Sequence, residues 1–429
     1  MTYADALQYL YEQLPMFSRI GAAAFKKDLS NTKQLCAVLN NPQTKFKCVH
    51  IAGTNGKGSV SHMLAAVLQT AGYKTGLYTS PHLKDFRERI RVNGEECSKD
   101  FVIEFTKKII PAIEKLQPSF FELTVAMAFE YFAQQQVDIA VIETGLGGRL
   151  DSTNIIMPEL SVITNIGYDH MNLLGNTLEK IAYEKAGIIK KNIPVIIGES
   201  INETRNVFQS SAKEKDAPLT FAQDNFYVQD FSYKHMQLKA EVVDKKKDEH
   251  HIYSLDLPGV YQIKNIITVL ETIHQLRLKN WKIKQHDVDA GLKKVKQLTA
   301  LHGRWEKIKD EPAVIVDVAH NVDGIKQLTE QLELVSYDEL HIIIGFVKDK
   351  DVLNILPLLP KIANYYFTKA QIPRAMNEND LAELAMQDGL HGKTFKEVNL
   401  ALKEALTHAG KNDLILICGS VFLVGEVIA

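Results

Sequence analysis

A glycine-rich segment about fifty residues from the start, His50 to Ser59, constrains the fold of this chain more than any other feature. It reads HIAGTNGKGS. An apolar run, Phe46 to Ile51, leads into it, and the apolar residues of Val60 to Ala71 recur at helical spacing. The glycines therefore lie where a buried strand gives way to a helix, which predicts a strand–loop–helix unit.

The residue types of this loop suit a phosphorylated nucleotide. The first N–H groups of a helix have no partner inside it, and the helix dipole leaves roughly half a positive charge there. Glycines let the backbone follow phosphate oxygens, Lys57 can reach the outer phosphates, and the Ser59 hydroxyl can ligate magnesium. Gly53 lies three residues before Gly56 instead of five, and Gly58 follows the lysine. This spacing disfavours a generic switch GTPase, and an ordinary glycine-rich turn is the alternative.

Length and composition bound the class of protein. A chain of 429 residues predicts two domains, and its 45% hydrophobic and 24% charged content is that of a soluble globular protein. A net charge of -2 gives no excess to capture a polyanion, so we expect no nucleic-acid partner. No stretch is apolar and long enough to span a membrane, and the start lacks a secretory signal pattern. We therefore expect a cytoplasmic protein with no membrane partner.

The pattern of cysteines is consistent with a cytoplasmic protein. They are scattered without a CxxC pair, which argues against a zinc site and a disulfide framework and favours reduced thiols. The four are Cys36, Cys48, Cys97 and Cys418.

Alternating strands and helices predict an α/β fold with two domains. Residues 1–298 are expected to form a P-loop NTPase-like domain with a mostly parallel sheet, and residues 299–429 a smaller Rossmann-like α/β domain. The linker is expected at Leu298 to Arg304, where both patterns lapse. The expected strands are Phe46–Ile51, Thr75–Thr79, Asp138–Glu143, Leu160–Thr164 and Pro194–Ile197, then Ala313–Val316, Leu340–Ile344, Tyr365–Thr368 and Leu414–Cys418.

Short alternating segments near 219–256 predict a small antiparallel appendage. Its charged run, Asp244 to His251, is expected to be a solvated turn. Helical periodicity returns at Tyr261 to Leu278.

Polar residues just after two predicted strands point to a ligand site, because ligands of open parallel sheets bind beyond the carboxyl ends of the strands. Glu143 ends one strand and leads into a second glycine-rich loop, where it could ligate magnesium or orient water. His170 follows the next strand exit. A loop acid and a structural histidine are the alternatives. Lys185, by composition alone, would be a solvated lysine near a glycine C-cap.

The second domain also carries charges at strand ends. Asp317 closes one strand, Asp349 and Lys350 follow Gly345 at the end of another, and Arg304 stands just past the linker. Their placement predicts a cleft between the domains, although helix capping accounts for the two aspartates nearly as well.

Taken together, the ordered segments resemble the folylpolyglutamate synthase and dihydrofolate synthase family, within the wider group of Mur-type ATP-dependent amide ligases. The resemblance covers nearly the whole chain. Its carriers are Gly53–Ser59, Thr79–Leu83, Glu143–Asn154, Asp169–His170, Glu184–Gly187, Pro258–Gly259 with Gln262 and Asn265, Gly303–Arg304, Asp317 with Ala319–Asn321, and Asp349–Asp351.

The resemblance implies a cytoplasmic ligase that joins L-glutamate to a pteroate or folate carboxylate with ATP and Mg²⁺, through an acyl phosphate. Lys57, Glu143, His170 and Lys185 would be the catalytic residues, and Lys185 would be carbamylated. A monovalent cation is left unassigned. The implied nucleotide contacts are Thr54, Asn55, Gly56, Lys57, Gly58, Ser59, Asn265, Arg304, Asp317 and His320. The implied metal ligands are Ser59, Ser80, Glu143, His170 and carbamylated Lys185.

The same resemblance places the pterin substrate near Ser119, Phe120, Phe121, Glu122, Leu150, Asp151 and Ser152. An aromatic ring can stack on a flat heterocycle and Asp151 can bond its amino groups, although an apolar helix start explains the two phenylalanines equally. Asp349 and Lys350 are candidates for the glutamate side. The chain departs from the family at Tyr261, usually histidine, at Ser152, usually alanine, and in Ala22 to Asn31, which lacks the common signature. The preferred acceptor therefore stays open.

Two other functions remain as alternatives. A cell-wall Mur ligase shares the mechanism but carries a uridine-nucleotide domain ahead of its phosphate loop, and only about fifty residues precede Gly53 here. A non-ligase nucleotide switch would not need charges at the strand ends of a second domain. We expect a monomer with small-molecule substrates that makes both the first and the later glutamate additions.

Overall fold

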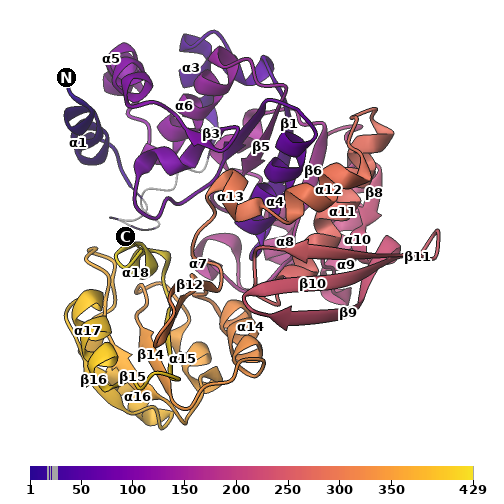
Figure 1. Cartoon of the computed structure of the whole chain (residues 1–429). Helices are drawn as coiled ribbons and strands as arrows, with labels where there is room; N and C mark the ends of the chain where they lie inside the picture. Colours follow the sequence, from indigo (N-terminus) through magenta and orange to yellow (C-terminus); the bar gives the residue numbers. More distant parts are fainter. Residues whose placement is uncertain (17–18, 20, 22–27, 429) are drawn as a thin grey trace.

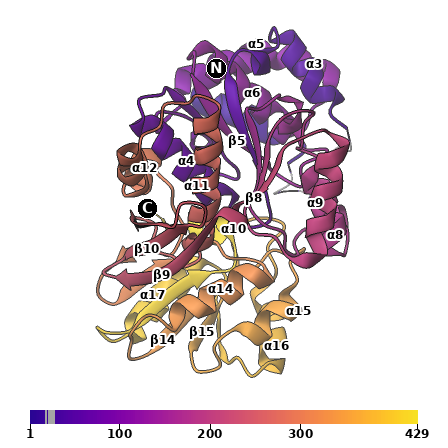
Figure 2. The same cartoon turned by 90° about the vertical axis from the view of Figure 1, so that its right-hand side faces the viewer.

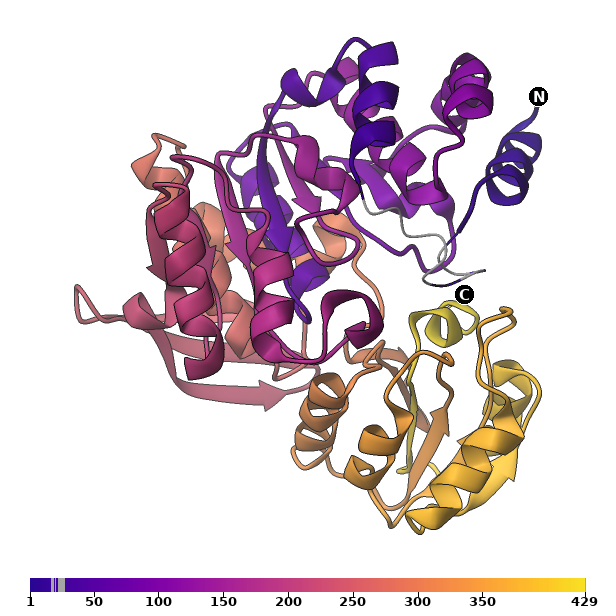
Figure 3. The ribbon, with the colours of Figure 1, turned by 180° about the vertical axis from the view of Figure 1, so that it is seen from behind.

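The computed structural model describes residues 1–16, 19, 21 and 28–428. Two sheets, each covered by helices on both faces, form two units stacked one above the other (Figure 1). Figure 3 shows the same arrangement from behind, with the orange and yellow second unit below the first. The α/β prediction is confirmed. Among the described helices, none combines the length and the apolar character needed to cross a membrane.

The first sheet has eight strands in the order β4-β3-β2-β5-β1-β6-β7-β8. β2, β5, β1, β6, β7 and β8 run parallel, and β3 and β4 add an antiparallel edge. β1 lies at the centre, between β5 and β6, so the glycine-rich loop leaves the middle of the sheet. The strands are β1 (Lys47–Ala52), β2 (Thr75–Tyr78), β3 (Ile90–Val92), β4 (Glu95–Glu96), β5 (Ile139–Glu143), β6 (Leu160–Ile163), β7 (Val195–Ile197) and β8 (Leu219–Phe221).

Alternate residues of β1 supply the cores on the two faces of this sheet. Val49 and Ile51 pack with α4 (Lys57–Thr70), while Cys48 joins the cluster on the other face. Strands buried on both faces read as continuous apolar runs, which is why this strand was predictable. The α4 face also carries α11 (Gln262–Leu278), α12 (Gln285–Leu292) and α13 (Val295–Thr299). The opposite face carries α1 (Tyr3–Gln13), α3 (Ser30–Val38), α5 (Lys99–Leu116), α6 (Phe120–Gln134), and, near β6 and β7, α8 (Leu178–Ala186) and α9 (Asn202–Glu214).

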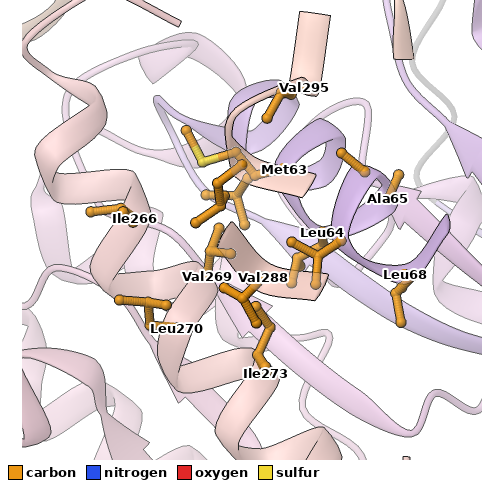
Figure 4. Packing of buried hydrophobic residues seen from close by; sticks show 14 of the residues in the cluster. Met63, Leu64, Ala65, Leu68, Ile266, Val269, Leu270, Ile273, Val288 and Val295 are labelled. Carbon is orange, nitrogen blue, oxygen red and sulfur yellow. The ribbon is translucent and has the colours of Figure 1, made fainter. Parts of the chain in front are cut away.

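α4 is buried along most of its length because helices cover its outer side. Figure 4 shows Met63 and Leu64 of α4 opposite Val269 of α11 and Val288 of α12. This packing fixes the helix whose first turn follows the glycine-rich loop. The remaining short elements of this unit are α7 (Met171–Leu174), α10 (Ala222–Asn225), η2 (Pro42–Thr44), η3 (Phe86–Arg89) and η4 (Ser152–Ile155).

A three-stranded antiparallel sheet, ordered β11-β10-β9, packs beside α11 and α12, as Figure 2 shows. It consists of β9 (Phe226–Lys234), β10 (Gln237–Asp244) and β11 (Glu249–Leu255). The expected appendage began at 219, but β8 (Leu219–Phe221) instead pairs in parallel with β7 in the main sheet. Only Lys245 to Asp248 of the charged run form the turn, because Glu249 to His251 belong to β11.

The second sheet has six strands in the order β12-β13-β17-β14-β15-β16, parallel except for β12. They are β12 (Glu306–Lys309), β13 (Ala313–Val316), β14 (Leu340–Ile344), β15 (Asn364–Phe367), β16 (Gly392–Thr394) and β17 (Leu414–Cys418). One face carries α14 (Val322–Leu332), α15 (Val352–Ile355), η5 (Leu356–Leu358) and α16 (Glu378–Gln387), and the other α17 (Val398–His408) and α18 (Val421–Gly425). The expected linker, residues 298–304, overlaps the connection from α13 to β12, although Leu298 and Thr299 belong to α13.

Candidate active site

The glycine-rich loop connects β1 to α4, and two of its glycines have conformations and surroundings that exclude a side chain. Gly56 has φ +79°, and a Cβ there would lie 2.3 Å from Asn265 Oδ1. At Gly53 a Cβ would lie 1.8 Å from Thr164 Oγ1. The loop therefore needs glycine for both conformation and space.

Hydrogen bonds fix the rest of the loop. Thr54 Oγ1 donates to Gly167 O at 3.1 Å and accepts from Gly167 N at 2.9 Å. Asn55 N donates to Asn165 Oδ1 at 2.9 Å. Lys57 Nζ folds back onto Gly53 O and Thr54 O, both at 3.1 Å. Its ammonium thus lies above the loop, where a phosphate group would be bound.

Ser59 and the first turn of α11 contact each other beneath the loop. Gln262 Nε2 donates to Ser59 Oγ at 3.2 Å, and Asn265 Nδ2 donates to Gln262 Oε1 at 2.7 Å. The predicted nucleotide contact Asn265 therefore lies beside Gly56 and is oriented by a buried glutamine.

Glu143 ends β5 at the same edge of the sheet. Its Oε2 accepts from Ser80 N at 3.2 Å, and both residues line the cavity above the loop. Burial raises the pKa of Glu143, and the charge of Lys57 opposes that rise. A buried carboxylate with serine oxygens nearby has the hard ligands that Mg²⁺ prefers.

Asp169 and His170 follow β6 and meet the second unit. Lys350 Nζ lies 2.6 Å from Asp169 Oδ1, and His320 Nε2 lies 3.4 Å from Asp169 Oδ2. Burial lowers the pKa of His170 to about 3, so its ring is neutral near pH 7 and suited to metal ligation.

Lys185, in α8, is buried and not solvated as composition alone would suggest. Only 4% of it is exposed, and Nζ donates to Gly53 O at 2.7 Å. Desolvation, reinforced by the charge of Lys57, lowers the pKa of its amine to about 7. At pH 7 roughly half of this amine is therefore neutral and available as a nucleophile.

Arg304 and His320 bring the second unit to the loop. Arg304 Nη2 lies 3.3 Å from the position of a Cβ on Gly58, and His320 lines the same cavity. Asn55 and Asn321 exchange amide hydrogen bonds of 3.2 and 3.0 Å across the two units. Asp317 is deeply buried and caps its own chain, with Oδ1 accepting from Ala319 N at 2.9 Å.

One cavity contains the predicted nucleotide and metal residues together. It is lined by Thr54, Asn55, Gly56, Lys57, Gly58, Ser59, Ser80, Glu143, His170, Lys185, Asn265, Arg304, Asp317 and His320. Asn165 and Tyr261 also line it, and sequence reasoning gave neither a role. Asn165 follows a predicted strand directly, which is the signal that could have found it.

A second, larger cavity adjoins the first and contains the residues predicted for the pterin. It is lined by Ser119, Phe120, Phe121, Glu122, Leu150, Asp151 and Ser152. Ser80, Gly145, Leu146, His170 and His320 line both cavities. The two cavities therefore meet at Ser80 and His170, two of the residues expected to hold the metal.

The residues predicted to bind the pterin differ in their exposure and in their hydrogen bonds. Phe120 is buried against Tyr11 and Phe86, whereas Phe121 is partly exposed. Asp151 Oδ1 and Oδ2 accept from Thr153 N at 3.0 Å and Leu146 N at 2.8 Å, so its carboxylate also anchors the loop.

Glu122 closes a capping box by accepting from Ser119 N at 2.6 Å. Its Oε1 is buried without a hydrogen-bond partner among the described residues.

The two candidates for binding L-glutamate, Asp349 and Lys350, lie in different surroundings. Lys350 lines the second cavity, whereas Asp349 pairs with Arg374 at 2.5 Å and lines neither cavity. Residues 22–27 of the segment that departs from the family signature lie outside the described residues.

Comparisons with known proteins agree with this architecture. The family description "Mur ligase middle domain" matches residues 51–273, and "Mur ligase, glutamate ligase domain" matches residues 303–421. The dihydrofolate synthase/folylpolyglutamate synthase of Bacillus subtilis is 34% identical over 99% of this chain and 98% of its own length.

Solved structures are similar over the full length. E. coli FolC in complex with DHPP and ADP has a TM-score of 0.84 at 30% identity, covering 100% of this chain and 97% of that one. A bifunctional folylpolyglutamate synthase/dihydrofolate synthase with Mn, AMPPNP and L-glutamate bound has a TM-score of 0.82 at 27% identity, with the same coverage.

Proposed function

This chain belongs to the Mur ligase family, as an ATP-dependent ligase of the folylpolyglutamate and dihydrofolate synthase kind, and from that premise we propose its substrates and the roles of its residues. It joins L-glutamate to dihydropteroate and to reduced folates, and so makes both the first and the later additions. The observation that carries this proposal is the shared wall of the two cavities at His170, Ser80 and His320. A phosphate in one cavity can there meet a carboxylate in the other.

The first step forms an acyl phosphate. A carboxylate oxygen of the pteroate or folate attacks the γ-phosphorus of ATP, and ADP leaves. Thr54 to Ser59 hold the phosphates, with Lys57 and Arg304 opposing their charge. Ser59, Ser80, Glu143 and His170 would hold Mg²⁺, which supplies further charge stabilisation when bound. Asn265, Asp317 and His320 complete the nucleotide contacts.

The second step forms the amide. The amino group of L-glutamate attacks the acyl carbon, inorganic phosphate leaves, and the nitrogen loses a proton. Lys350, on the second-unit wall of the acceptor cavity, is our candidate to bind a glutamate carboxylate. We keep Asp349 only as a residue that positions Arg374 by its ion pair.

We propose that Lys185 is carbamylated and then serves the metal. Its neutral amine attacks CO2, and loss of a proton leaves a carbamate whose oxygens can ligate Mg²⁺. The support is a buried amine with a pKa of about 7 beside the phosphate loop.

The acceptor is proposed to lie with its pterin between Phe121 and the loop around Asp151. Phe121 offers a ring face, and the carboxylate of Asp151, which lines the same cavity, can accept from amino groups of the heterocycle. Leu150 and Ser152 complete this wall beside Ser119, and Phe120 supports it from the core.

A monomeric, cytoplasmic enzyme is part of the proposal. The four buried free thiols suit a reducing compartment.

The experiment compares acceptors. Purified protein with ATP, Mg²⁺ and L-glutamate is given either dihydropteroate or tetrahydrofolate, and products are identified by mass. We expect both acceptors to gain glutamate, with at least one glutamyl unit added to each. Product from only one acceptor would overturn the bifunctional assignment, and ligation only to a UDP-linked muramyl substrate would overturn the folate assignment.

A further inference from the structure

The turn Gly303-Arg304-Trp305 carries Arg304 from the second unit to the phosphate loop, and its shape depends on bonds from both sides. Trp305 has φ +48°, a left-handed conformation that is uncommon for a bulky residue. Such a conformation persists only where surrounding contacts hold it. The direction in which Arg304 points is therefore set by the anchors of this turn.

The entry to the turn is anchored by Glu306. Its carboxylate accepts from Gly303 N at 2.8 Å and pairs with Lys296 Nζ at 2.6 Å. Lys296 belongs to α13 of the first unit, so this anchor already crosses between the units.

The exit of the turn is anchored by Asp317, whose Oδ2 accepts from Trp305 N at 2.8 Å. The same oxygen accepts from Tyr261 Oη at 2.6 Å. Tyr261 immediately precedes α11 in the first unit, and Asp317 follows β13 in the second. The side chain of Trp305 is fully buried, and its Nε1 donates to Tyr233 Oη at 3.1 Å.

The residues next to Tyr261 face the phosphate loop. Gln262 bonds Ser59, and Asn265 lies against Gly56. The start of α11 thus contacts the loop through two side chains, and Tyr261 beside them reaches the Arg304 turn through Asp317. Nucleotide phosphates held by the loop would be approached by Arg304 only when this turn is correctly placed.

We propose that Tyr261 is a positioning residue which, through Asp317 and the Trp305 turn, aims Arg304 at the phosphates of the bound nucleotide. It links the phosphate loop to the second unit without touching the reacting atoms. This inference rests on the proposed nucleotide role of the loop, and it does not depend on the identity of the acceptor.

The test uses ADP binding to the full-length protein by calorimetry, without folate or glutamate. Tyr261→Phe removes one hydroxyl that bonds a carboxylate, and we expect ADP affinity to fall about tenfold. In an Arg304→Ala background the same change should have almost no further effect, because there is no guanidinium left to position. Tyr253→Phe is the matched control: it removes a buried tyrosine hydroxyl bonded to Gln285, away from the site, and should leave affinity unchanged.

Tyr233→Phe gives an independent arm, since it removes the bond on the other side of Trp305. It should also weaken ADP binding, and again only while Arg304 is present. The proposal would be overturned if both Tyr261→Phe and Tyr233→Phe bound ADP with wild-type affinity. It would also be overturned if these changes lowered ADP affinity equally with and without Arg304. Because no ligation is measured, an inactive enzyme would refute the proposed function and leave this result intact.

Discussion

Lys57 and Lys185 donate to the same carbonyl oxygen, that of Gly53, at 3.1 and 2.7 Å. Two cations at one backbone oxygen repel each other, and this repulsion contributes to the lowered pKa of Lys185. An anion, either a phosphate or a carbamate, relieves that repulsion. The pair therefore favours the binding of phosphate and the modification of Lys185 together.

Replacing Lys57 by alanine should abolish ligation while the protein stays folded. The side chain reaches over the loop and is not part of a hydrophobic cluster, so its loss removes charge without opening the core. Initial-rate assays and thermal unfolding of the variant check this. Turnover at the wild-type rate would refute a role in phosphate binding.

Ligase activity should rise with pH through about pH 7 when bicarbonate is present. The pKa of Lys185 is lowered to about 7, so the amine is mainly protonated at pH 6 and mainly neutral at pH 8, and only the neutral form takes up CO2. Rates at pH 6 and pH 8, with bicarbonate added or removed, check this. The opposite trend would contradict it.

A second arm of this experiment uses Lys185→Ala. That variant should be inactive and regain partial activity with short carboxylates such as acetate, which can replace the carbamate oxygens. No recovery at any carboxylate concentration would remove the main support for carbamylation.

At the scale of elements, α4 has a left-handed glycine at each end, and the two differ in what surrounds them. Gly56 at the start has φ +79° and Gly72 after the end has φ +89°. A Cβ on Gly56 would strike Asn265, whereas one on Gly72 would meet nothing within 4 Å. Comparing alanine variants of these two glycines therefore distinguishes the effect of backbone strain from the effect of damage to the nucleotide site.

Gly72→Ala should therefore cost about 1–2 kcal/mol of stability, from the left-handed conformation alone, with nucleotide affinity unchanged. Gly56→Ala should cost at least as much stability and also lose most nucleotide affinity. Thermal unfolding and ADP titration of both variants check this. Equal ADP affinities in the two would contradict the account of the loop.

Central strands were easier to predict from the sequence than edge strands. Long apolar runs such as Leu340–Ile344 were predicted with the bounds that the structure has, because central parallel strands are apolar on both faces. Short edge strands such as β4 (Glu95–Glu96) and β16 (Gly392–Thr394) were missed because they are polar and owe their conformation to a neighbouring strand. β8 (Leu219–Phe221) was assigned to the appendage because it is a three-residue edge strand that shortly precedes the antiparallel segments.

At the scale of the whole molecule, the site exists only where the two units meet. Asn55 and Asn321 are 266 residues apart in sequence and exchange two hydrogen bonds beside the phosphate loop. Asp169 of the first unit likewise accepts from Lys350 of the second. Contacts between the two units should therefore affect turnover.

Asn321→Ser should lower kcat with little loss of stability, because serine can still cap α14 but is too short to bond Asn55. Asn321→Ala loses both roles and should cost about 1 kcal/mol more in stability. Steady-state kinetics and denaturant unfolding of both variants check this. A serine variant with wild-type kcat would show that the amide pair does not matter to the reaction.

Site residues that follow strands, such as Glu143 and His170, were predictable from the sequence because strand ends of a parallel sheet converge whatever the details of the fold. Tyr261 and Asn321 were assigned no role from the sequence, because their partners lie in the other unit. Lys185 was assigned through resemblance alone, because its burial against Gly53 comes from the packing of α8 and leaves no mark in local composition.

The most direct test of the whole account is phosphate release from ATP by the purified protein with Mg²⁺, a reduced folate or dihydropteroate, and L-glutamate. The acyl phosphate should turn over only when an amine attacks it, so we predict steady phosphate release that requires both the acceptor and L-glutamate. Phosphate release at the same rate without glutamate would contradict the account.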